Sequence, residues 1–139
     1  FRFNGIGECV TWGLYNNDAP SAEQIAQFEE VALWAARAGL GLTIHWNNEA
    51  SIHHLLDAFA HVRAQVNYAP LRWSVAHVHD ARPETLQRLK ELDLGWLMQN
   101  RLYFAAPAFL ARYETARLQV MPPLKRAVQM GLPTGGGAG

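Results

Sequence analysis

Two histidines and one glutamate have the positions of a metal site. His45 follows an alternating apolar run at 40–44, and such alternation is typical of a β-strand. His77 follows a second apolar run at 71–76, and each histidine precedes a polar segment and then a helical pattern. Because parallel strands in βα units bring their C-terminal ends to one edge, the two histidines are predicted to converge there. Glu8, after a short glycine-rich stretch, is a third candidate, either facing a metal or solvated in a loop.

Each of these residues also has a structural interpretation. A histidine at a strand end can simply satisfy a backbone carbonyl, and the sequence leaves this open for His45 and His77. Cys9 is interpreted as a small buried apolar residue and not as a nucleophile, because no basic residue flanks it. His54, Asp57 and His61 share one face of a predicted helix, and we interpret this face as solvated.

The remaining pattern alternates strands and helices along the whole chain. Ser21 and Gln24 form a capping-box pattern, and Gly39 is a natural helix terminator. Helices are predicted from Ser21, over 50–66, from Pro83, over an irregular stretch at 103–118 and from 122 to 130; strands are predicted at 1–6, 40–45, 71–77, 94–98 and 132–136. The irregular helical stretch, interrupted by Pro107, could form a lid or an entrance wall. The order βαβαβαβαβ predicts a parallel sheet with right-handed crossovers.

Composition excludes several classes of partner. The chain of 139 residues has a formal net charge of zero, so it lacks the basic footprint of a nucleic-acid-binding protein. No apolar run is long enough to cross a bilayer, so no membrane partner is expected. A single cysteine excludes an internal disulfide and suits a reducing compartment, and we therefore expect a cytoplasmic location.

Four segments, in the right order, resemble motifs of one enzyme family. The segment 42–52 resembles the His-x-x-Gly-Asp-x-x-Ile motif on the fifth strand of amidohydrolase family 3, of the amidohydrolase superfamily. Residues 75–79 resemble the motif of its sixth strand, and the predicted strand that ends at Gln99 resembles that of its seventh. Residues 123–128, with the glycines that follow, resemble the motif that leads to its eighth strand.

The resemblance implies an α/β fold, a partial (β/α)8 TIM barrel of about strands four to eight. Residues 1–139 would then be a single partial barrel domain, a fragment of a larger catalytic domain. Members of this family are metal-dependent hydrolases of amide, cyclic amide and related C–N bonds that use a metal-activated water. The resemblance makes His45 and His77 metal ligands and Glu8 a stand-in for the bridging ligand, with a divalent metal, zinc being the expected ion, in an incomplete site.

The same resemblance suggests roles for three more residues, and the sequence also departs from the family's motifs. His79, Gln99 and Arg101 are predicted to contact substrate. Asn48 and Glu49 stand where the family has Gly-Asp. The catalytic residue is unknown, because the family's base aspartate is expected beyond the C-terminus and its first-strand His-x-His pair is absent. We therefore expect the isolated chain to be inactive, with a small-molecule substrate for the parent enzyme.

A second function remains open from the sequence. The chain could be a non-catalytic βα binding or assembly module in which both strand-end histidines are structural. A partial barrel would also leave strand edges and apolar faces exposed, which predicts a possible homodimer through those edges.

Overall fold

The fold is a single parallel sheet flanked by helices. The computed structural model describes residues 4–10, 18–99 and 101–137, with 101, 102 and 105 described by their backbone alone. The strands are β1 (Gly5–Ile6), β2 (Gly41–Trp46), β3 (Ser74–His77), β4 (Gly95–Gln99) and β5 (Thr134–Gly137). They lie side by side in sequence order, and every neighbouring pair is parallel. The predicted order of strands and helices is therefore confirmed.

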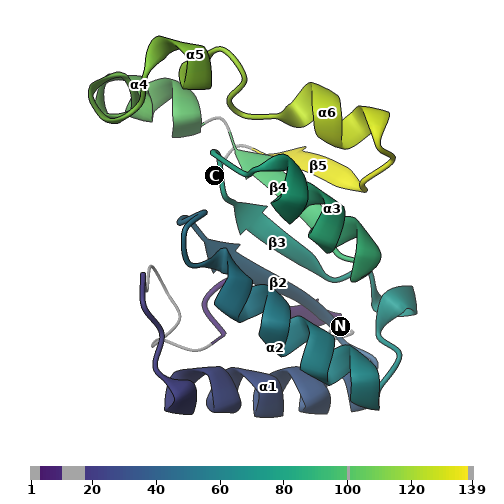
Figure 1. Ribbon diagram of the computed structural model, residues 1–139. Helices are drawn as coiled ribbons and strands as arrows, with labels where there is room; N and C mark the ends of the chain where they lie inside the picture. The colour runs from purple at the N-terminus through teal and green to yellow at the C-terminus, as the bar shows by residue number, and fades with distance from the viewer. Residues whose placement is uncertain (1–3, 11–17, 100, 138–139) are drawn as a thin grey trace.

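Helices connect successive strands. They are α1 (Ala22–Arg37), α2 (Ile52–Gln65), α3 (Pro83–Glu91), α4 (Arg101–Arg112), α5 (Thr115–Leu118) and α6 (Leu124–Gln129), with a short 3₁₀ turn, η2 (Ala69–Leu71), before β3. Figure 1 shows α2 and α3 across the same face of the sheet, with α1 beside α2 and with α4 and α5 beyond β4. This arrangement places one layer of helices on one side of the strands.

Local sequence signals explain where the helices begin and end. The Ser21 hydroxyl accepts a hydrogen bond from the Gln24 N–H, and the Gln24 side chain accepts one from the Ser21 N–H, so the predicted capping box starts α1. Gly39 follows α1 with φ +67°, a conformation that glycine adopts without a steric penalty. Pro83 opens α3, where its missing N–H is not needed.

The core lies between the sheet and the helices. Aromatic side chains dominate it: Phe28, Phe59, Tyr68, Trp73 and Trp96 are all fully buried. Tyr68 and Trp73 stack with ring centroids 4.4 Å apart, and Phe59 packs against both. This cluster joins α1, α2 and the segment that leads into β3 into one unit.

The sheet is open, with β1 and β5 at its two edges. An open, all-parallel βα sheet of this kind is consistent with part of a TIM barrel, as predicted. Several large apolar side chains are exposed in the described part of the chain, namely Trp34, Tyr103, Phe104, Leu110, Val120, Leu124 and Val128. Dimerisation through the sheet edges stays a prediction. No described helix is long and apolar enough to span a bilayer.

Candidate metal centre

The ends of β1, β2 and β3 bring three predicted residues together. β2 and β3 are in register over Thr43–Ser74 to Trp46–His77, so His45 and His77 lie on neighbouring strand ends. The β1 segment runs beside β2 beyond its two paired residues, because the His45 N–H donates to the Glu8 carbonyl over 3.3 Å. Glu8 therefore lies at the C-terminal ends of the strands, as both histidines do.

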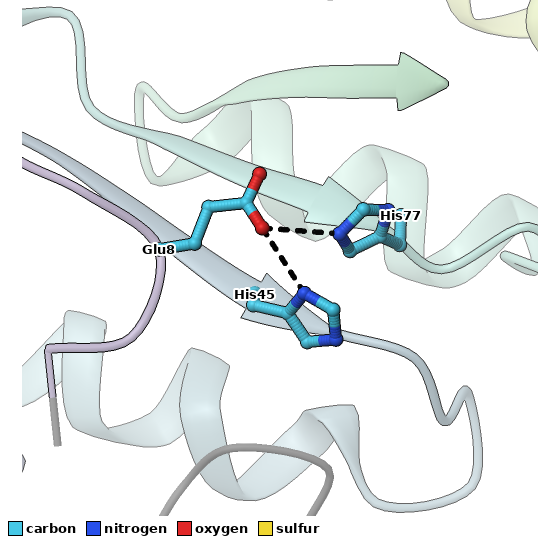
Figure 2. A group of neighbouring side chains, drawn as sticks. All are labelled: Glu8, His45 and His77. Carbon is cyan, nitrogen blue, oxygen red and sulfur yellow. Dashed lines mark hydrogen bonds and ion pairs between the residues drawn. The ribbon is translucent and has the colours of Figure 1, made fainter. Parts of the chain in front are cut away.

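One carboxylate oxygen of Glu8 faces both imidazole rings. Glu8 Oε2 lies 3.1 Å from His45 Nδ1 and 3.3 Å from His77 Nε2, as Figure 2 shows. The two rings contact each other with centroids 4.2 Å apart. His45 and His77 are buried, whereas the Glu8 side chain is 35% exposed. The site is thus closed on the histidine side and open to solvent at Glu8.

Hydrogen bonds from the two histidines stabilise the ionised form of the Glu8 carboxyl. Burial by itself would raise the pKa of Glu8, but the hydrogen bonds from His45 and His77 outweigh it and hold that pKa below 4.5. An ionised carboxylate only accepts hydrogen bonds, so each ring nitrogen facing it must donate an N–H. A metal ion would replace these two protons, since imidazole binds metals through a deprotonated nitrogen.

The donor set and spacing fit a small divalent cation. Among the described residues, Glu8, His45 and His77 are the group whose ligand atoms all lie within 4.8 Å of one another. Two donors bound at ~2.1 Å with a tetrahedral angle are about 3.4 Å apart, close to both observed distances from the carboxylate oxygen. Two imidazoles and a carboxylate are also a ligand set that zinc accepts. The chain therefore brings together three side chains that could hold such an ion.

Backbone geometry distinguishes His77 from His45. His77 has φ +78° and Val78 has φ +45°. A positive φ is rare for residues other than glycine and is especially unfavourable for β-branched valine. Such conformations cost on the order of 1–3 kcal/mol each and persist where the surroundings hold them. The strain lies at the residue that presents one of the three ligands.

Of the other residues predicted to contact substrate, His79 lies beside this group, and none whose side chain the structure describes belongs to it. His79 is buried, with its ring centroid 5.9 Å from that of His77 and 6.0 Å from that of Phe109 in α4. Gln99 ends β4, where it pairs in register with Gly137. Arg101 begins α4, and its side chain lies outside the described part of the chain. Their roles toward substrate stay predictions.

Sequence reasoning missed a polar cavity beside the C-terminal ends of β2 and β3. This cavity, of about 250 Å³, is lined by Asp18, Asn47, Asn48, Asp80, Arg112 and Tyr113. The Tyr113 hydroxyl donates to the Asp80 carboxylate over 2.7 Å, and Arg117 donates to the Asp80 carbonyl. Burial and this hydrogen bond raise the pKa of Tyr113 above 10, so the phenol stays a donor at neutral pH. No local signal pairs Tyr113 with Asp80, because the contact joins the turn after α4 to the β3–α3 loop.

Cys9 corrects an interpretation made from the sequence. It was predicted to be a small buried apolar residue, but its side chain is exposed. Cys9 follows β1, which is an edge strand of the sheet. The absence of a flanking basic residue therefore did not predict burial.

Glu49 is a buried carboxylate that ties the β2–α2 loop to α3. Its side chain is only 8% exposed, and Oε1 accepts a 2.6 Å hydrogen bond from the Thr85 hydroxyl in the first turn of α3. Its other oxygen, Oε2, is buried without a hydrogen-bond partner among the described residues. Burial is the main cause that raises the pKa of Glu49 above 4.5, against the opposing effect of the Thr85 hydrogen bond.

Replacing Glu49 by glutamine is expected to change how stability depends on pH. A raised pKa means that the folded state holds its proton more tightly than the unfolded chain does. Protonated Glu49 therefore stabilises the folded state. This stabilisation is complete below pH 4.5 and is lost as the pH rises through the folded-state pKa. Glu49→Gln should gain stability relative to the wild type from pH 4 to pH 7, as measured by urea unfolding. Glu30→Gln, at an exposed position of α1, controls for the loss of one charge; parallel curves for Glu49→Gln and the wild type would contradict the prediction.

Close backbone packing of β1 on β2 positions Glu8. A Cβ on Gly5 would lie 2.8 Å from the Gly41 carbonyl oxygen, whereas a Cβ on Gly7 would have nothing within 4 Å. Gly5→Ala should therefore force β1 away from β2 and destabilise the protein by about 1–3 kcal/mol. Gly7→Ala should change stability by less than about 0.5 kcal/mol. Urea denaturation measures both variants, and equal effects would argue against the close approach.

Comparison with known proteins agrees with this geometry. A sequence model described as Amidohydrolase family matches residues 11–138. Comparisons with curated proteins and with solved structures found no match. The family match spans nearly the whole chain, and the structure independently places a carboxylate and two histidines where they could hold a metal. The chain therefore belongs to the amidohydrolase family, which indicates a function of the metal-dependent hydrolase type.

Proposed function

We propose that Glu8, His45 and His77 are the protein ligands of a divalent metal in an enzyme that hydrolyses amide or cyclic amide C–N bonds. One observation carries the proposal: a single carboxylate oxygen faces two buried imidazole nitrogens at the adjoining ends of three parallel strands. Family membership supports the reaction class. Zinc is the ion that we propose, because two imidazoles and one carboxylate match its preferred donors and leave an open position.

The bound cation would supply Lewis-acid chemistry, lowering the pKa of a water towards about 7 and polarising the carbonyl under attack. The chain's own residues would do the rest. His45 and His77 hold neutral nitrogens at fixed positions, because both rings are buried and in contact with each other. Glu8 adds a negative charge that offsets part of the charge of the cation.

Substrate would enter from the side on which α4 and α5 lie. Tyr113 and Arg117 bind the loop after β3 through Asp80, so these two helices are fastened close to His79. We propose that His79, Gln99 and Arg101 contact substrate from the ends of β3 and β4 and the start of α4. Arg101 would suit a substrate carboxylate, because guanidinium pairs with it through two parallel hydrogen bonds.

A metal-binding measurement separates this proposal from a purely structural role. The Glu8–His45–His77 group is also a hydrogen-bonded cluster in its own right, as a non-catalytic module would have. Zinc content after equilibrium dialysis should reach one ion per chain if the three residues are ligands. Glu8→Gln should lower this content, because a neutral amide is a much weaker zinc ligand than a carboxylate. A wild-type protein that retains no zinc, cobalt or manganese would overturn the proposal and favour the structural role.

A further inference from the structure

The turn that carries His77 leaves the regular pattern of its strand. The β3–β4 ladder ends at the Ala76–Leu97 pair, one residue before His77. Side chains alternate between the two faces of a strand, so a regular β3 would place His77 on the face of Val75. The left-handed conformations of His77 and Val78 interrupt this alternation. In the structure the His77 ring faces Glu8 (Figure 2).

Two hydrogen bonds hold this turn. The Val78 N–H donates to the Trp46 carbonyl over 2.9 Å, which keeps the turn attached to β2. On the other side, the indole N–H of Trp96 donates to the His77 carbonyl over 2.7 Å. This bond lies inside the core, because Trp96 and Val78 are fully buried. The His77 carbonyl thus has a buried indole N–H as its partner on the β4 side.

We infer that Trp96 is a positioning residue for the metal centre: its indole N–H holds the His77 carbonyl and thereby orients the His77 imidazole towards Glu8. This inference rests on the proposed metal site. The effect passes through one peptide unit, since rotating the His77 carbonyl changes the backbone angles that place its own ring. Trp96 contributes no atom to the Glu8–His45–His77 group, so its loss should weaken binding without removing a ligand.

The chain contains a matched control for this bond. Trp73 is also fully buried, and its indole N–H donates to a backbone carbonyl, that of Leu40, over 2.8 Å. That carbonyl precedes β2, at the end of the strand away from His45. Phenylalanine at either position removes one buried indole donor and part of one side-chain volume. A general loss of packing should therefore affect Trp73→Phe and Trp96→Phe alike.

The test compares cobalt and zinc binding in the wild type, Trp96→Phe and Trp73→Phe. We expect Trp96→Phe to bind zinc about 10- to 100-fold more weakly, as groups that orient metal ligands do. Its Co²⁺ visible absorption should also shift, because the His77 ligand is displaced. Trp73→Phe should keep the affinity and the spectrum of the wild type, with urea unfolding confirming that both variants are folded.

Each outcome decides the inference. Wild-type affinity in Trp96→Phe, or an equal loss in Trp73→Phe, would overturn the positioning role and leave the metal site standing. No metal bound by the wild type would overturn the metal site and the positioning role together. If Trp96→Phe does not fold, 3-benzothienylalanine at position 96 keeps the shape of the side chain and lacks only the N–H donor, and the same affinities and spectra apply to it.

Discussion

Alanine at either strand-end histidine is expected to weaken zinc binding by more than about 100-fold. His45 and His77 each contribute one of three ligand atoms that lie within 4.8 Å of one another. Loss of a residue that merely orients a ligand lowers metal affinity by about 10- to 100-fold, so loss of a ligand should exceed that range. Isothermal titration calorimetry of His45→Ala and His77→Ala measures the change, with circular dichroism to check the fold.

The matched control for these two variants is His61→Ala. His61 also hydrogen-bonds a carboxylate, that of Glu29, over 2.9 Å, but its side chain is 69% exposed and it lies on α2. His61→Ala should bind zinc as the wild type does. An equal loss in His61→Ala would mean that surface histidines bind the metal, and full affinity in either strand-end variant would remove that residue from the ligand set.

Truncation of Phe59 is expected to have the largest effect on stability. Phe59 is fully buried, and its ring packs edge-on against Phe28 with centroids 5.2 Å apart and against Tyr68 and Trp73 at 6.1 and 6.0 Å. Phenylalanine-to-alanine changes in cores cost about 3–5 kcal/mol, from lost apolar transfer and from the cavity left behind. Domains have only about 5–15 kcal/mol of net stability, so Phe59→Ala should lose a large part of it.

Urea unfolding of Phe59→Ala and Phe104→Ala tests this expectation. Phe104, on α4, is 75% exposed, so its truncation should change the free energy of unfolding by less than about 0.5 kcal/mol. The same chemical change at a buried and an exposed site isolates burial as the cause. A loss of less than about 1 kcal/mol for Phe59→Ala would show that the aromatic cluster does not hold α1, α2 and β3 together.

The order of elements and the convergence of His45 and His77 could be predicted from the sequence, because their signals are local. Alternation at 40–44 and the polar residues that follow mark a strand end, and the same pattern identifies His77. The capping box at Ser21 acts within one turn of helix, so its outcome does not depend on distant contacts. Parallel pairing then brings the ends of neighbouring strands to one edge, which is why His45 and His77 meet.

Contacts between distant segments were decided by the tertiary structure. Glu8 carries little signal of its own in the sequence. It faces both histidines because Gly5 lets this segment approach β2 closely. Burial of Glu49 against Thr85, and exposure of Cys9, depend on what packs over each residue. The left-handed turn at His77 is unfavourable locally, and two hydrogen bonds hold it: the Val78 N–H donates to the Trp46 carbonyl, and the Trp96 indole N–H donates to the His77 carbonyl. Short-range patterns thus determined which residues could bind a metal, and packing between strands decided whether their side chains face one another.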